Sequence, residues 1–206
     1  GQTWEKLHQG LPSGSINVII EHPDNSDVLF VGTENSVFVS VNGGEKWAKV
    51  SGNLPTTLYD DMLIHPRDKD LVLGTHGRSF WILDDTSPFA EWHQSKDNNV
   101  HLFSIRPATL FYYWKDTSYR GQEEWAGPNP PYGALINFVV NNEADSARVS
   151  ISRNKKIVRE YNIAVNKGKL DQVVWNLKYA PPSFEKNEKK TEGLTKPDRS
   201  QLLPIP

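Results

Sequence analysis

The chain has 206 residues, no cysteine, seven Trp and a formal net charge of -2 at pH 7. These values exclude a disulfide framework and thiolate chemistry, and the scattered Lys and Arg residues give no basic surface for nucleic acid. No apolar run approaches the roughly 20 residues that span a bilayer, so we expect no transmembrane segment. The many aromatic, Gly and Pro residues are typical of short strands joined by tight turns, which favours an all-β fold.

The first 90 residues contain an internal repeat with a period of 42 to 43 residues. The repeat aligns Trp4 with Trp47 and Phe38 with Phe80, and it includes a His-Pro dipeptide in each copy. A period of about 40 to 45 residues that holds several short strands is typical of a β-propeller, in which each repeat forms one four-stranded blade. We therefore predict strands at 15–21, 28–33, 36–41 and 46–50 in the first repeat, and at 58–64, 71–76 and 79–83 in the second.

The two ends of the repeat region predict missing neighbours. The second repeat lacks its fourth strand, because Asp84 and the polar residues after it stand where that strand would begin. Residues 1–9 match the fourth strand of a repeat, so the sequence starts inside a blade. Two blades cannot close a ring that needs at least about four. We therefore expect a fragment of a larger protein, with upstream propeller blades of the same protein as its first partners.

A turn pattern, SVNGGEKW, joins the third and fourth strands of the first repeat. An Asx side chain bonds to backbone N–H groups two residues on, and glycines take the positive φ that a tight turn demands. The Trp at the end of the pattern is expected to pack beneath the turn. The structural residues of this turn are Ser40, Asn42, Gly43, Gly44 and Trp47.

This turn resembles the Asp-box, with Asn42 in place of the usual Asp. In the segments VFVSVNGGEKWAKVSGNLP and DMLIHPRDKDLVLGTHGRSFWILDD the chain is similar to Asp-box (BNR) repeat proteins, related to sortilin-type, sialidase and xyloglucanase propellers. The resemblance covers about residues 1–90. It implies a secreted, periplasmic or cell-surface protein of a bacterial envelope. Many members of this group are named glycoside hydrolases without a demonstrated activity.

The second half of the chain carries strands without the repeat period. Residues 87–99 predict a short helical or irregular exit, and 100–114 predict an extended aromatic strap. Its Phe111, Tyr112, Tyr113 and Trp114 are expected to join the two domains rather than to line a sugar site. Four strands follow from Ala134, and they resemble a small immunoglobulin-like sandwich with Trp175 in its core. The charged residues after Pro181 predict a mobile loop or tail.

The predicted fold class is therefore all-β, with the last blades of an Asp-box β-propeller followed by a small Ig-like β-sandwich. The predicted domains are 1–88 for the blades, 89–130 for the linker or strap, 131–182 for the sandwich, which is incomplete with four strands, and 183–206 for the charged loop or tail.

Propeller topology predicts one ligand-carrying face. Turns from fourth to first strands and from second to third strands open on that face, and the Asp-box turn lies on the other. The polar residues that the sequence places there are Asp60 and Asp61 at the start of an inner strand, His76 and Arg78 in one turn, and Glu34 and Asn35 in the equivalent turn one blade earlier. We expect these side chains to form a binding cluster on the channel face.

Paired carboxylates about 5 to 10 Å apart could cleave a glycosidic bond. Asp60 and Asp61 are not expected to form that pair, because adjacent side chains of a strand point to opposite faces. The simpler interpretation is that one of them caps the strand, that Arg78 bonds to a carboxylate or carbonyl, and that His76 is structural. No catalytic residue is assigned.

No cofactor and no metal site is predicted. Acidic residues in turns leave Ca²⁺ binding as a weak alternative with unspecific spacing. The leading hypothesis is a non-catalytic binding or scaffold propeller that recognises a glycan, a peptide or a protein. One alternative is a sialidase- or xyloglucanase-like glycoside hydrolase whose catalytic residues lie partly on other blades. Another is a purely structural subunit of an envelope complex.

Overall fold

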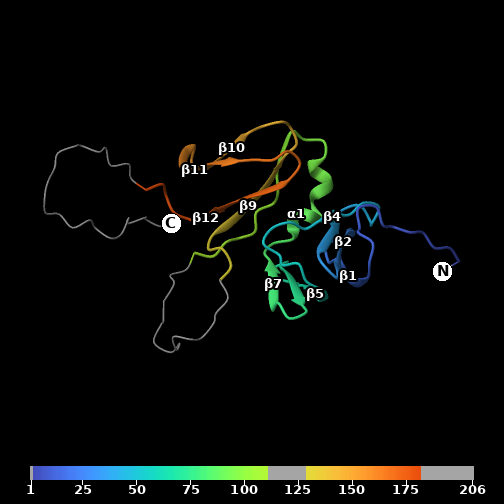
Figure 1. Ribbon diagram of the computed structural model, residues 1–206. Coiled ribbons are helices and arrows are strands. Elements are labelled where there is room, and N and C mark those ends of the chain that lie inside the picture. The colour runs from blue at the N-terminus through green and yellow to red at the C-terminus, as the bar shows by residue number, and fades with distance from the viewer. Residues whose placement is uncertain (1, 111–128, 182–206) are drawn as a thin grey trace, which may run out of the picture. The chain divides into compact units, whose positions relative to one another are not determined.

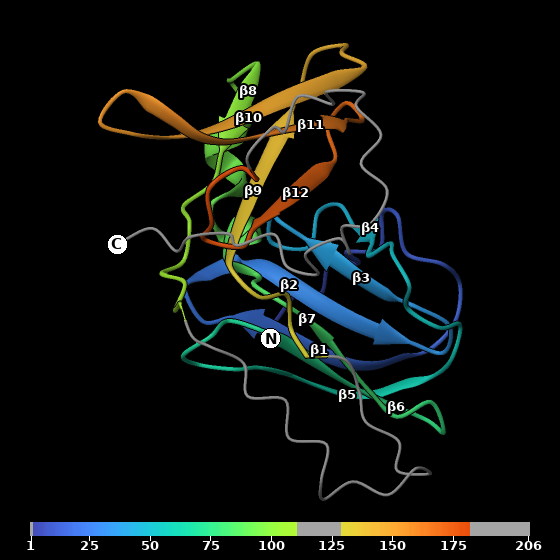
Figure 2. The same cartoon turned by 90° about the vertical axis from the view of Figure 1, so that its left-hand side faces the viewer.

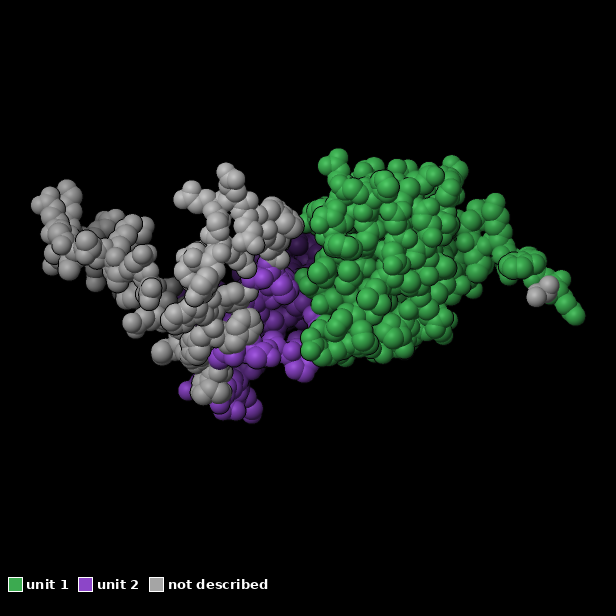
Figure 3. Space-filling view, turned by 90° about the horizontal axis from the view of Figure 1, so that it is seen from below, with its two compact units in different colours: residues 1–104 green, residues 105–206 purple. Residues whose placement is uncertain are grey.

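The computed structural model describes residues 2–110 and 129–181 and divides the chain into two compact units, Gly1–Ser104 and Ile105–Pro206 (Figures 1 and 3). Among the described residues of both units, β-strands are the main secondary structure and helix is confined to two short turns. The predicted all-β class is confirmed.

The first sheet of unit 1 is a four-stranded antiparallel meander. Its strands are β1 (Ile16–His22), β2 (Asn25–Thr33), β3 (Val37–Ser40) and β4 (Ala48–Lys49), in the order β1-β2-β3-β4. Figure 2 shows β1, β2 and β3 running side by side. Each strand lies within three residues of its predicted bounds, and the two-residue β4 is shorter than expected.

The second sheet has three strands, β5 (Tyr59–Ile64), β6 (Leu71–Thr75) and β7 (Phe80–Leu83), in the order β5-β6-β7. Within the described residues no fourth strand pairs with β7. As predicted, the outer strand of this blade is absent from the described part of the chain. The outer edge of β7 therefore has no strand partner among the described residues.

One apolar core joins the two blades. It contains alternate residues of β2 and β3 from the first sheet, and the inward residues of β5 and β6 from the second. Each large side chain buried in this way stabilises the fold by about 1.5 to 3 kcal/mol. The buried members of this core are Val28, Phe30, Val37, Val39, Tyr59, Met62, Ile64, Leu71 and Leu73.

The strand register corrects one alignment of the repeat. Val31 lies opposite Phe38 in the first blade, and Leu73 lies opposite Trp81 in the second. Trp81, rather than Phe80, therefore occupies the position of Phe38. The reason is the hairpin length: residues 34–36 join β2 to β3, whereas 76–79 join β6 to β7. Because the β6–β7 hairpin is one residue longer, the register of β7 is shifted by one position relative to β3. A residue of β7 therefore faces the opposite side of the sheet from the residue of β3 with which the sequence repeat aligns it.

The exit from the second blade takes the helical one of its two predicted forms. It consists of α1 (Ser87–Ala90), the 3-10 helix η1 (Trp92–Ser95) and the short strand β8 (Val100–Leu102). An edge contact between Phe30 and Phe89, with ring centroids 5.6 Å apart, fastens α1 to the first blade. Stacked rings then continue from Phe89 through Trp92 to Phe103. The strap residues 111–114 lie outside the described residues.

Unit 2 contains the four predicted strands, β9 (Ala134–Val140), β10 (Ser146–Arg153), β11 (Lys156–Ala164) and β12 (Leu170–Trp175). β10 and β11 form a hairpin whose two turn residues, Asn154 and Lys155, both have positive φ, as in a type I′ turn. β9 pairs with β12, and Trp175 packs against a core centred on Phe138. The immunoglobulin-like assignment stays a prediction, and the predicted tail lies outside the described residues.

Candidate functional site

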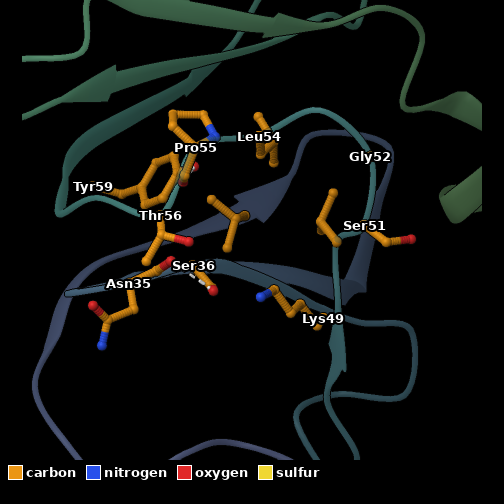
Figure 4. A pocket seen from close by; sticks show the side chains of 11 residues that line it. Asn35, Ser36, Lys49, Ser51, Gly52, Leu54, Pro55, Thr56 and Tyr59 are labelled. Carbon is orange, nitrogen blue, oxygen red and sulfur yellow. Dashed lines mark hydrogen bonds between the residues drawn. The ribbon is translucent and has the colours of Figure 1, made fainter.

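A pocket of about 280 Å³ opens between the β2–β3 hairpin and the segment that joins β4 to β5 (Figure 4). These are the two kinds of turn that the sequence places on the ligand-carrying face. Of the six predicted binding residues, only Asn35 lines this pocket. Its other lining residues are Ser36, Val37, Lys49, Val50, Ser51, Gly52, Leu54, Pro55, Thr56 and Tyr59.

The inner wall of the pocket is rigid. The ring of Tyr59 is fully buried, and its hydroxyl donates a hydrogen bond of 2.7 Å to the carbonyl oxygen of Pro55. Burial raises the pKa of Tyr59, so its phenol stays protonated at neutral pH. Because the ring face has no exposed area, Tyr59 supports the wall but offers no surface on which a ligand ring can stack.

The hairpin at the mouth of the pocket is fixed by Thr33. Its Oγ1 accepts hydrogen bonds from the backbone N–H groups of Asn35 and Ser36, at 3.3 and 3.1 Å, and donates one of 3.0 Å to the carbonyl oxygen of Ser36. Thr33 and Ser36 are buried, whereas Asn35 is exposed. The hairpin therefore presents the Asn35 side chain from an ordered turn, consistent with the preference of Ser and Thr for such turns.

Among the described residues that line the pocket, Lys49 is the only charged one. Figure 4 shows its ammonium group pointing toward Ser36. Across the described residues, the structure gives its side chain no hydrogen bond and no ion pair. The pocket therefore has a positive centre without a protein counter-charge.

The structure brings together two of the predicted residues on the second blade. The Nδ1 atom of His76 lies 3.4 Å from an Oδ atom of Asp60, and both side chains are exposed. The backbone of His76 is also tied to the link from β4, since its N–H donates to the carbonyl of Leu58 and its own carbonyl accepts from the Thr57 hydroxyl. Asp60 and His76 thus form a polar pair, and His76 is bonded to Thr57, the residue that follows the pocket-lining Thr56.

The other predicted residues do not join this pair. Asp61 accepts a hydrogen bond of 2.8 Å from the backbone N–H of Met62, so Asp60 and Asp61 hold different partners, as expected. Arg78 is exposed, and in the described part of the chain its side chain has no bond to a carboxylate or carbonyl. Glu34 is exposed at the β2–β3 hairpin.

The sequence offered no motif for two of the pocket residues. Lys49 lies on the two-residue strand β4, and Thr56 lies in the segment that joins β4 to β5.

The turn from Ser40 to Trp47 lies at the opposite end of the first blade, because successive hairpins of a meander alternate between its ends. The Ser40 hydroxyl donates to Asn42 Oδ1 at 2.9 Å and accepts from the N–H of Gly44 at 2.9 Å. Asn42 Oδ1 also accepts from the N–H of Lys46 at 3.1 Å. The Asx bond therefore reaches four residues along the chain, rather than the two expected.

Two features complete this turn. Gly43 and Gly44 have φ values of +66° and +90°, which side-chain-bearing residues rarely adopt. Trp47 is 6% exposed and packs against Val31 and Phe38, and its Nε1–H donates to the carbonyl of Leu7 at 3.2 Å. These contacts give the turn a structural role that is consistent with its predicted one.

No group of three or more His, Asp or Glu side chains that could hold a metal ion occurs within 2–110 and 129–181. Two of the acidic residues in turns are paired with cations: Asp24 lies 2.9 Å from the Lys69 ammonium nitrogen, and Asp68 lies 2.7 Å from Arg67 Nη2. None of the described helices is both long and apolar enough to cross a membrane.

Residues 1–176 match the family model Sortilin-Vps10, described as sortilin, neurotensin receptor 3. The chain belongs to the Sortilin-Vps10 family. This family is associated with a β-propeller role in binding and sorting, and its members are typically secreted or lumenal. The match confirms the predicted propeller and sortilin-type likeness, and it extends beyond residue 90 to β12. No curated protein and no solved structure gives a significant match to this Sortilin-Vps10 chain.

Proposed function

We propose that this chain is part of a non-catalytic propeller that binds a glycan, a peptide or a protein on the face formed by its β2–β3 and β6–β7 hairpins. The observation that carries the proposal is the pocket beside Lys49, which opens at that face and has an unpartnered cation in the described structure. The binding role of the Sortilin-Vps10 family supports the same conclusion.

Preorganised polar groups support binding at this face. Thr33 holds the first hairpin, and the hydrogen bond of 3.1 Å from Thr57 to the His76 carbonyl holds the second. Side chains on fixed turns lose less conformational entropy when a ligand binds. Exposed Asn35, His76 and Arg78 can therefore contact a ligand without a prior rearrangement of their backbone.

Further propeller blades are the first partners in this proposal. Phe80 and Ile82 of β7 are 76% and 60% exposed, whereas Val37 and Val39, which hold the equivalent places on β3, are 1% and 8% exposed. Blade two covers the face of β3. An additional blade packed in the same way would cover Phe80 and Ile82, since exposed apolar groups of this size mark interaction surfaces.

The same proposal places the whole protein outside the cytoplasm, as a secreted, periplasmic or cell-surface component. A glycoside hydrolase would need a carboxylate across a sugar from Asp60 or Asp61, supplied by another blade. A purely structural subunit would need neither a pocket nor exposed polar groups on this face. Binding is preferred because it uses the groups that the described blades present.

Glycan and peptide arrays probed with the full chain test this proposal. The double variant Asn35→Ala/Arg78→Ala should weaken binding by about tenfold or more, because it removes polar contacts worth about 1.4 kcal/mol together. Glu45→Ala, in the turn at the opposite end of the blade, should bind as the parent does. Equal binding by the parent chain and the double variant would contradict the proposal. Polysaccharide cleavage that Asp61→Ala abolishes in a folded protein would establish the hydrolase instead.

A further inference from the structure

The charge of the Lys49 pocket favours a ligand with one negative charge. Lys49 is the only cation among the described lining residues, and the nearby acidic groups do not neutralise it: Asp60 pairs with His76, and Glu34 does not line the pocket. A lone ammonium group acts as a point charge. A phosphate monoester carries a charge of about −1.5 to −2 at pH 7, which is more than one ammonium group balances. A carboxylate therefore fits this pocket better than a phosphate.

The size of the pocket limits the ligand further. At about 280 Å³ it lies just below the usual range of small-molecule sites, which starts at about 300 Å³. This volume accommodates one sugar ring or one amino-acid side chain. The ligand group that enters the pocket is therefore a single residue of whatever longer molecule carries it.

The neutral polar groups around Lys49 favour a sugar. The side chains of Thr56 and Asn35 line the pocket, and neither has a hydrogen-bond partner among the described residues. Figure 4 shows Thr56 across the pocket from Lys49, with Asn35 at the rim. A hydroxyl and an amide both donate and accept, which matches the vicinal hydroxyl groups of a sugar. Since Tyr59 is buried, the described lining residues offer no aromatic face for stacking, so charge and hydrogen bonds must supply the affinity.

We infer that this pocket binds the carboxylate-bearing ring of a uronate, with the Lys49 ammonium group on the carboxylate and with Thr56 and Asn35 on the ring hydroxyls. The inference rests on the proposed binding function and names its ligand class. The remainder of an acidic glycan would extend over Thr57 toward His76, whose carbonyl accepts the Thr57 hydroxyl at 3.1 Å.

Titration calorimetry on the full chain with methyl glucuronide tests the inference, with methyl glucoside and acetate as matched probes. Methyl glucuronide should bind, and its affinity should fall as salt screens the ammonium group. Lys49→Met keeps the aliphatic stem and removes the charge, so it should weaken binding by about tenfold or more. Lys46→Met, in the exposed turn at the other end of the blade, is the control and should leave the affinity unchanged.

Three results would overturn the inference. They are methyl glucoside that binds as tightly as methyl glucuronide, acetate that binds as tightly, and unchanged affinity in a folded Lys49→Met variant. Thr56→Val supplies a second test, since it should weaken methyl glucuronide more than acetate. If array binding persists and still depends on Asn35 and Arg78, but methyl glucuronide does not bind, then the proposed binding function is supported and the uronate ligand class is wrong.

Discussion

The Nε2 atom of His22 lies 3.1 Å from the Oγ1 atom of Thr86, a residue 64 positions later in the chain. His22 ends β1 of the first blade, and Thr86 follows β7 of the second. The N–H of Asp24 donates to Nδ1 of His22 at 3.1 Å, and the Thr86 hydroxyl donates to the Lys69 carbonyl at 2.6 Å. This order of donors requires a neutral imidazole with its proton on Nε2. A buried hydrogen-bonded chain therefore links the two blades.

Thr86→Val should break this link without changing the volume of the side chain much. It leaves the Nε2–H of His22 buried without an acceptor, which costs about 1 to 3 kcal/mol of the free energy of unfolding. Urea denaturation of the full chain, followed by Trp fluorescence, measures the loss. Thr57→Val removes a more exposed hydrogen bond and should cost less. An equal or smaller loss for Thr86→Val would contradict the assigned role of the link.

The stability of the chain should also fall in acid because of His22. Burial lowers the pKa of His22; Asp24 acts against this shift and Lys69 adds to it, both more weakly. The unfolded chain has an ordinary imidazole with a pKa of about 6.5, so below that pH it binds a proton that the folded chain resists. The contribution is thus fully present above about pH 6.5 and is lost as pH falls toward the lower folded pKa.

The comparison variant for this pH effect is His22→Gln, which cannot titrate. Its free energy of unfolding, measured by urea denaturation between pH 7 and pH 5, should decrease less steeply than that of the parent chain. Both proteins keep the same carboxylates, so the difference between the two slopes reports on His22 alone. Parallel slopes would mean that His22 is not held neutral in the folded state.

The repeat predicted the seven strands β1–β7 of the two blades because turn residues and β-branched residues alternate along it at a fixed period. It could not predict the register of β7. Phe80 and Trp81 are adjacent aromatics, so the sequence accepts either as the counterpart of Phe38. Only the hydrogen-bonded pairs Leu73–Trp81 and Gly74–Phe80 decide between them. A difference of one residue in a hairpin leaves the composition unchanged, but it changes which face of the sheet each aromatic covers.

The sequence predicted the end of the blades at which the pocket opens, but not the residues that line it, apart from Asn35. Strand topology placed Asp60 and His76 at neighbouring strand ends, and the structure finds them 3.4 Å apart. The pocket itself depends on how the chain leaves β4, since Lys49, Leu54 and Thr56 come from a short strand and an irregular link. Irregular links carry no periodic signal, so their side-chain directions follow from packing against Tyr59 rather than from a sequence pattern.

Asn42 should be better than Asp in this particular turn, although Asp is the usual residue of the resembled motif. The Nδ2–H₂ group of Asn42 donates to Glu45 Oε2 at 3.3 Å, while its Oδ1 accepts from Lys46 N–H. Asp would keep the accepted bond but would place a second carboxylate beside Glu45. Asn42→Asp should therefore lower the free energy of unfolding by about 0.5 to 1 kcal/mol in low salt.

A double-mutant cycle with Glu45 checks this explanation. Asn42→Asp should be nearly neutral in a Glu45→Gln background, because the opposing charge is then absent. Urea denaturation at low and high salt measures the four proteins, and added salt should shrink the loss in the Glu45 background. A loss of the same size in both backgrounds would show that the charge of Glu45 is irrelevant and that Asn42 acts by another route.

The exposed face of the second sheet should affect association more than folding. Phe80 and Ile82 are 76% and 60% exposed, so Phe80→Ser/Ile82→Ser should change the free energy of unfolding by no more than about 1 kcal/mol. Leu73→Ala, at a position with 0% exposure, should cost about 2 to 5 kcal/mol. Analytical ultracentrifugation should show less self-association for the double variant, because it removes an exposed apolar patch. If the double variant is destabilised as strongly as Leu73→Ala, then the patch is already covered within the chain, and the proposed contact with a further blade is wrong.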